Sequence, residues 1–194
     1  MNPFKYIAFL FLTSSILWSC TSPNPKIVMK TELGNITIEL YSQKAPITVS
    51  NFIKYIDENR LKEATFYRTV TLSNQPDNDI KIEVIQGGLY EDEHPQMLAP
   101  IQHETTKTTG ILHKDGVISL ARNEPGTATC EFFICIGDQP SLDFGGGRNP
   151  DSQGFAAFGR VINGMDVVYR IQQANADGQW LEPRIKIIRI GLVE

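Results

Sequence analysis

A succession of short, β-like runs constrains the fold more than any other feature of the sequence. Each run is rich in β-branched or aromatic residues and ends at a cluster of Gly, Pro, Asp or Asn. A first stretch, IVMKTELGNITIEL, predicts two strands around a Leu33-Gly34-Asn35 turn, and the later runs are TFYRTV, IKIEVIQGG, GVISLAR, CEFFICIG, FAAFGRV and RIKIIRIGLV. Helices do not alternate with these strands as they would in a parallel sheet. The pattern therefore predicts a mostly-β fold, a closed antiparallel barrel of about eight strands.

Two segments have helical rather than strand-like periodicity, and we expect them to cap the barrel as two α-helices. The first is APITVSNFIKYIDENR, in which Pro46 suits the first turn and the apolar face is formed by Val49, Phe52, Ile53 and Ile56. The second spans Met165–Gln173, with its apolar residues at Met165, Val168, Tyr169 and Ile171.

The charge balance argues against a nucleic-acid binder. The formal net charge is −4, and no stripe of Lys and Arg is present to neutralise phosphates. The GGG at 145–147 precedes Arg148 and Asn149 instead of the Lys-Ser/Thr of a phosphate-binding loop. His94, His103 and His113 have no metal-ligand spacing, so we interpret them as surface or loop residues and expect no metal site.

The first twenty residues differ from the rest of the chain. A lysine in a short polar start is followed by an apolar run from Tyr6 to Trp18, which has the proportions of a secretory signal and is too short to span a bilayer comfortably. The sequence Leu17-Trp18-Ser19-Cys20 resembles the bacterial lipobox. The alternative is a buried cysteine in an N-terminal helix.

By this resemblance, residues 1–19 are a lipoprotein signal peptide and Cys20 becomes the lipidated first residue of the mature protein. Several acyl chains would hold it firmly, because each buried CH₂ contributes about 0.8 kcal/mol. Residues 20–28 are then a polar, proline-containing tether, and residues 29–194 are the folded domain. Because Thr21 rather than Asp follows the cysteine, we expect the outer membrane of the cell envelope rather than the inner membrane.

From about Lys30 to its end, the chain resembles the cyclophilins, which are peptidyl-prolyl cis-trans isomerases. TELGNITIELYSQKAPITVSNFIKYI is similar to the opening strand pair and helix of the family, and TFYR to its F-H-R strand. The phrases that follow in the family's order are VIQGG, GVISLAR, CEFFICIG and FAAFGRVINGMDVV.

The resemblance implies roles for individual residues. Arg68 takes the place of the catalytic arginine, Gln86 that of the glutamine that orients it, and Phe133 that of the floor under the proline ring. On the strand alone, Arg68 would be a surface charge and Phe133 a core residue. The other positions that the resemblance assigns to substrate binding are Val84, Ala121, Arg122, Glu131, Leu142 and Phe155.

An arginine suits this reaction. Rotation of an X-Pro bond breaks amide resonance, with a barrier of roughly 20 kcal/mol. A fork of permanently charged N–H donors can bond the twisted amide more strongly than the planar one. The chemistry itself requires no nucleophile, metal or cofactor.

Several positions depart from the family's pattern. Arg122 stands where an Asn is usual, and Phe155 where a histidine is usual. Glu131 replaces a Gln, and we expect its carboxylate to pair with Arg122 or Arg68. Val84 lies in an unusually long connection between Arg68 and Gln86. Ser141 replaces an indole that contacts cyclosporin, so we expect weak or no binding of that drug.

The predicted function is therefore an X-Pro isomerase, acting as a monomer on proline-containing polypeptides and assisting folding in the envelope. Two alternatives remain open: a catalytically weak proline-peptide-binding or chaperone module on the same fold, and a barrel that serves only as a docking domain.

Overall fold

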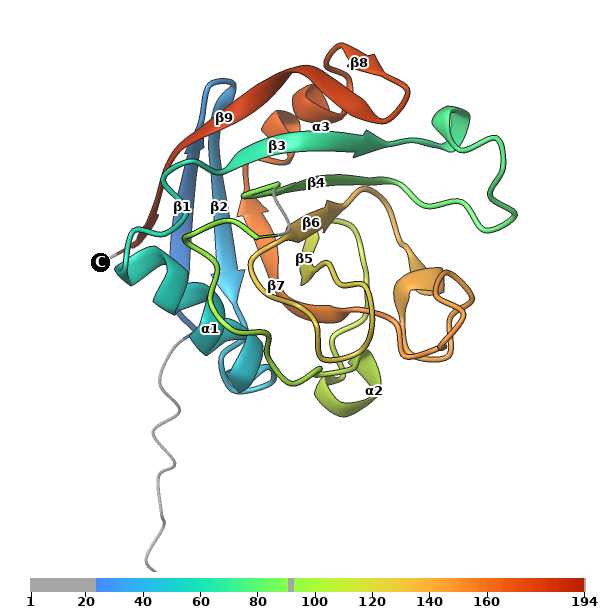
Figure 1. Cartoon of the computed structure of the whole chain (residues 1–194), viewed down its shortest axis with the longest axis horizontal. Helices are drawn as coiled ribbons and strands as arrows, with labels where there is room; N and C mark the ends of the chain where they lie inside the picture. Colours follow the sequence, from blue (N-terminus) through green and yellow to red (C-terminus); the bar gives the residue numbers. More distant parts are fainter. Residues whose placement is uncertain (1–23, 91–92, 194) are drawn as a thin grey trace, which may run out of the picture.

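Within residues 24–90 and 93–193, which the structure describes, the chain forms nine strands that pair only in antiparallel fashion (Figure 1). This computed structural model contains them in one continuous sheet. The strands are β1 (Lys26–Thr31), β2 (Gly34–Leu40), β3 (Thr65–Val70), β4 (Val84–Gly88), β5 (Val117–Leu120), β6 (Phe132–Cys135), β7 (Ala156–Asn163), β8 (Ala176–Asp177) and β9 (Trp180–Leu192).

Eight of these strands close into a barrel. Their order is β1-β2-β7-β5-β6-β4-β3-β9, and β9 pairs back with β1 from Ile27↔Leu192 onward. The two-residue β8 pairs only with β9 and lies outside the ring. The closed eight-stranded barrel expected from the sequence is thus confirmed, and closure leaves no long unpaired edge within the ring.

Both predicted helices are present in the described part of the chain, and a third, single-turn helix accompanies them. They are α1 (Pro46–Asp57), α2 (Thr106–Thr109) and α3 (Met165–Gln172). The short α2 has no apolar periodicity; Thr105 caps its start and Gly110 ends it with a φ of 69°. None of the described helices has the length and apolar character that crossing a bilayer would need.

The buried face of α1 is rotated from the one that hydrophobicity predicts. Val49 and Phe52 are buried as expected, but Ile53 and Ile56 are only partly buried. Polar contacts account for the difference: Glu104 accepts hydrogen bonds from both the backbone N–H and the hydroxyl of Thr48 at 2.7 Å. On the same side, the backbone N–H of Leu98 donates to the Tyr55 hydroxyl at 2.7 Å. The segment around residues 98–104 therefore covers the polar side of α1 that contains Thr48 and Tyr55.

The barrel begins earlier than the expected domain boundary. β1 starts at Lys26, and Ile27 is fully buried, so residues 26–28 belong to the barrel and not to the tether. Successive side chains of a strand point to opposite faces, and Ile27 and Met29 both point into the core, so the strand includes residues before Met29. The predicted signal segment and Cys20 lie outside the described residues.

His113 lies in a loop, as expected, and its side chain is buried there. Its Nδ1 lies 2.7 Å from Asp143 Oδ1 and its Nε2 lies 3.0 Å from Ser119 Oγ. His94 and His103 are partly exposed. Among residues 24–90 and 93–193, no group of three His, Cys, Asp or Glu side chains is arranged to hold a metal ion.

Candidate active site

A row of residues in register across four strands builds the centre of the site. Arg68 on β3 lies opposite Gln86 on β4, Gln86 opposite Phe133 on β6, and Phe133 opposite Ser119 on β5. Directly opposite residues in an antiparallel sheet project to the same face. Pairing alone therefore brings Arg68, Gln86 and Phe133 together, although Arg68 and Phe133 are 65 positions apart in the sequence.

These residues line a cavity of about 170 Å³. Seven of the nine site residues expected from the sequence border it: the three proposed catalytic residues together with Val84, Ala121, Leu142 and Phe155. The lining is completed by Ile82 and Arg148, which the sequence did not single out. The walls are mainly apolar, and the polar groups that enter the cavity are the two arginines and the Gln86 amide.

Arg68 is held by two amide oxygens. Its Nη1 donates to Gln86 Oε1 at 2.9 Å, while Nε and Nη2 both donate to Gln179 Oε1, at 2.9 and 2.6 Å. Gln179 is fixed in turn, because its Nε2 donates to the carbonyl of Asn74 at 3.0 Å. Burial lowers the pKa of the Arg68 guanidinium, but an arginine starts so high that it stays charged.

Gln179 lies in the turn between β8 and β9, and sequence reasoning missed it. Turn residues contact whatever the strands they join bring close, so a local pattern contains little signal for such a contact. Gln179 directly precedes Trp180, and only the pairing of Trp180 with Arg68 across β3 and β9 in the structure brings it to the site.

Phe133 is held from two sides at the floor of the cavity. The Phe155 ring packs against it edge-on, with centroids 5.2 Å apart and planes at 86°. The buried His113 ring stacks on it, with centroids 5.9 Å apart and planes at 16°. His113 is itself fixed by Asp143 and Ser119, so a buried polar network holds the phenyl ring that faces the cavity.

Comparisons with known proteins agree with this geometry. The family model for cyclophilin type peptidyl-prolyl cis-trans isomerase/CLD matches residues 26–192. A peptidyl-prolyl cis-trans isomerase of Acinetobacter baylyi is 38% identical over 151 residues, which are 76% of this chain and 72% of that protein. The chain belongs to the cyclophilin family.

Other cyclophilins extend the similarity. Peptidyl-prolyl cis-trans isomerase B of Escherichia coli is 32% identical over 149 residues, covering 75% of this chain and 83% of that protein. A crystal structure of a Cryptosporidium parvum cyclophilin covers 88% of this chain and 98% of its own with a TM-score of 0.68, at 17% identity. A second crystal structure of that protein was obtained in the presence of the dipeptide Ala-Pro.

The remaining two predicted site residues, Arg122 and Glu131, border a second cavity of this cyclophilin. It measures about 510 Å³ and adjoins the first, with Gln86 and Ala121 common to both. The expected pairing of Glu131 with Arg122 or Arg68 is wrong. Arg122 instead forms a two-pronged ion pair with Asp151, at 2.7 and 2.9 Å.

The Glu131 carboxylate binds hydrogen-bond donors other than the two arginines. It accepts hydrogen bonds from the Tyr67 hydroxyl at 2.6 Å and from the backbone N–H groups of Leu89 and Tyr90 at 2.7 and 3.0 Å. These backbone groups directly follow the end of β4 and need an acceptor. Burial raises the pKa of the Glu131 carboxyl, although the three hydrogen bonds act in the opposite direction.

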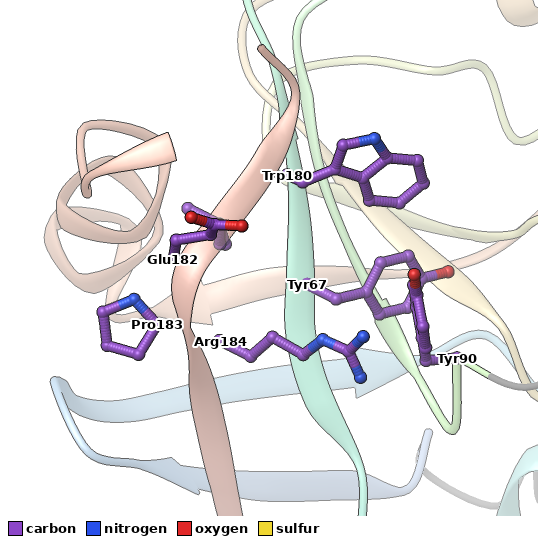
Figure 2. A pocket seen from close by; sticks show the side chains of 7 residues that line it. Tyr67, Tyr90, Trp180, Glu182, Pro183 and Arg184 are labelled. Carbon is purple, nitrogen blue, oxygen red and sulfur yellow. The ribbon is translucent and has the colours of Figure 1, made fainter. Parts of the chain in front are cut away.

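An aromatic cluster lines a third cavity of about 540 Å³ (Figure 2). Tyr67, Tyr90 and Trp180 contact one another there, and the Arg184 guanidinium lies 3.5 Å from the centre of the Tyr90 ring. Tyr67 connects the cluster to the first cavity, because Gln86 Nε2 donates to its hydroxyl at 2.8 Å. Half of Trp180 is exposed, at 49%.

Proposed function

We propose that this cyclophilin is a peptidyl-prolyl cis-trans isomerase and that Arg68 is its catalytic residue. One observation carries the proposal: a charged guanidinium, aimed by two neutral amides, borders an apolar cavity with an immobilised phenyl floor. The relatives named above as isomerases support it. Gln86 and Phe133 are proposed to act with Arg68 on the substrate.

The geometry suits a rotation rather than a bond cleavage. The proline ring enters the apolar cavity above Phe133, which fixes one end of the X-Pro bond. When the bond twists, the prolyl nitrogen loses its resonance with the carbonyl and gains a basic lone pair. The Arg68 N–H donors bond that nitrogen, or hold the neighbouring carbonyl, more strongly than they bond the planar amide.

Neutral partners matter for this step. A carboxylate beside Arg68 would neutralise much of its field, whereas the amide oxygens of Gln86 and Gln179 direct its donors and leave the positive charge in place. Each 1.36 kcal/mol taken from the barrier is about tenfold in rate. A single charged contact in a site shielded from water can therefore supply orders of magnitude.

The proposal is tested by Arg68→Ala in an X-Pro isomerisation assay. We expect kcat/KM to fall by about tenfold or more, because the contact is made best in the transition state. Arg68→Lys retains the charge without the fork of donors and should recover only part of the rate. Circular dichroism verifies that the fold is intact. A folded Arg68→Ala protein with the wild-type rate would remove Arg68 from the mechanism.

We further propose that the protein acts on folding polypeptides of the cell envelope, held by a lipid on Cys20. The lipobox-like end of the apolar N-terminal run supports this, and residues 21–25 provide a short polar spacer before β1. In two-membrane bacteria, Thr21 favours the outer membrane. Cys20→Ala should move the protein from the membrane fraction to the soluble or unprocessed pool. Continued membrane fractionation of a processed Cys20→Ala form would contradict the anchor.

A further inference from the structure

The proline cavity contains two guanidinium groups and no carboxylate. Besides Arg68, its wall includes Arg148, which comes from the long loop between β6 and β7. The other lining residues are uncharged: Ile82, Val84, Gln86, Ala121, Phe133, Leu142 and Phe155. The cavity thus has a formal charge of +2.

Neither arginine has an acidic partner among residues 24–90 and 93–193. Arg68 is bonded to two amides, and the Arg148 side chain donates one hydrogen bond, from Nη1 to the carbonyl of Ile80 at 2.6 Å. Other partly buried arginines of the same chain are neutralised, as Arg122 is by Asp151 and Arg60 by Glu58. A half-buried cation without a counter-ion is energetically costly, which makes an incoming anion favourable.

Arg148 is held in place by contacts of its backbone and of its neighbour Gly147. Its backbone N–H donates to the carbonyl of Ser141 at 3.1 Å, and the neighbouring Gly147 packs so closely on the Ile80 side chain that a Cβ there would lie 2.5 Å from it. Nη1 is used in the bond to Ile80, while Nε and Nη2 donate to no residue in the described part of the chain. Burial and the nearby Arg148 charge both lower the pKa of Arg68, consistent with two cations that share one space.

We propose that the pocket selects prolines flanked by a carboxylate and that Arg148 is the residue that recognises it. The substrate class is a polypeptide with Asp or Glu next to the X-Pro unit. This rests on the proposed isomerase function, in which the proline ring fills the cavity and Arg68 contacts the X-Pro amide. A flanking carboxylate then reaches the Arg148 guanidinium in the wall of the cavity.

The test uses the purified full-length protein and peptides with blocked ends, so that terminal charges do not contribute. In one series Glu, Gln or Lys immediately follows the proline, and in a second series the same residues immediately precede X. In one of the two series we expect kcat/KM for the Glu peptide to exceed that for the Lys peptide about tenfold, which corresponds to about 1.4 kcal/mol. Salt at about 1 M, where screening acts within about 3 Å, should reduce this ratio.

Arg148→Gln should bring the Glu-to-Lys ratio close to one, whatever the absolute rate, and Arg148→Lys should keep part of it. Arg189→Gln is the matched control, because it removes the same charge from an exposed position on β9 and should leave the ratio unchanged. Equal rates in both series, or a ratio that survives Arg148→Gln, would overturn the inference.

Calorimetric titration with the same peptides separates this inference from the proposed function. A protein that binds the Glu peptide about tenfold more tightly than the Lys peptide but isomerises neither would refute the isomerase and support the role of Arg148. Active isomerisation with no preference in rate or binding would support the isomerase and refute the role of Arg148.

Discussion

The guanidinium of Arg68 has three of its donors directed by two glutamine side chains that are 93 residues apart in the chain. Gln86 comes from the strand next to Arg68, whereas Gln179 comes from the turn between β8 and β9. Gln179 takes two of the three hydrogen bonds, so it defines the plane of the fork more than Gln86 does. We therefore assign Gln179 as a positioning residue for Arg68.

Replacement of Gln179 by Ala should lower kcat about tenfold, with a smaller change in KM, because the arginine remains but is no longer oriented. Gln179→Glu should also lower kcat, since a carboxylate keeps the geometry but neutralises the charge. Steady-state kinetics with thermal unfolding as a control distinguishes positioning from a structural role. If Gln179→Ala unfolds at the wild-type temperature and retains the wild-type kcat, the assignment fails.

Glu131 should make stability depend on pH in the direction opposite to that of an ion-paired carboxylate. Its pKa in the fold is raised above the ordinary value near 4.5, so the folded state binds more protons than the unfolded state between these two values. The free energy of unfolding should therefore fall as pH rises through that window. The penalty is absent at pH below the ordinary pKa and complete above the raised one.

Chemical denaturation of wild type and Glu131→Gln across this window is the measurement. The glutamine carbonyl can still accept from Leu89 and Tyr90, so the variant should fold and lack this part of the pH dependence. Glu124→Gln, at an exposed position, removes the same charge and serves as control. Identical slopes for wild type and Glu131→Gln would contradict a raised pKa at this carboxyl.

At the residue scale, the sequence predicted side chains on strands better than side chains on connections. The resemblance to the family indicated Arg68, Gln86 and Phe133, and strand register brings these three residues together in the structure. Gln179 and Arg148 were missed because a turn and a long loop deliver them, and their partners depend on how distant strands pack. The Glu131 contact was wrong because unpaired backbone donors after β4 competed successfully for its carboxylate.

At the scale of elements, the connection between β6 and β7 contributes more to the first cavity than any other connection that follows β4. It opens with a 3₁₀ turn, Pro140–Leu142, and then folds back on it: the Ser141 carbonyl accepts from the Arg148 N–H, and the Leu142 carbonyl accepts from the Phe155 N–H. The connection thereby supplies the cavity with Leu142, Arg148 and Phe155. The sequence shows the length of this connection but not its path, because few of its residues follow a regular alternation of apolar and polar side chains.

This connection should weaken cyclosporin binding. The resemblance to the family places Ser141 where an indole contacts the drug, and loss of a buried hydrogen bond with a large aromatic contact costs about 2–4 kcal/mol at a hot-spot position. That corresponds to about 30- to 1,000-fold in affinity. A cyclosporin titration of isomerase activity should show weak inhibition of the wild type and stronger inhibition of Ser141→Trp. Low-nanomolar inhibition of the wild type would contradict this expectation.

At the scale of the whole molecule, the barrel depends on the pairing of its first and last strands. The local alternation of apolar and polar residues predicted nearly every strand, and the absence of interleaved helices predicted antiparallel pairing. The order β1-β2-β7-β5-β6-β4-β3-β9 is not contained in any local pattern, because it depends on which strand edges meet. The sequence therefore predicted a closed antiparallel barrel of about eight strands but not the order of the strands within it.

Truncation tests how far the barrel extends. A chain that lacks residues 1–25 should unfold cooperatively at the wild-type temperature, since β1 is intact. A chain that lacks residues 1–31 loses the buried Ile27 and Met29 and exposes the edges of β2 and β9, so it should aggregate or fail to fold. Circular dichroism and size-exclusion chromatography provide the measurement. A monomeric, folded protein without residues 1–31 would show that closure by β1 is dispensable.

The pairing of β1 with β9 also determines when the barrel can close during translation. Ile27 leaves the ribosome long before its partner Leu192, and at roughly 5–20 residues per second the interval is on the order of 10 s. Throughout that interval one edge of β1 has no native partner and is open to strands of other nascent chains. Gln179, which orients Arg68, is also synthesised late, so the site assembles only when translation of the barrel is nearly finished. Because its site is complete only at that stage, the nascent chain cannot catalyse its own earlier folding steps.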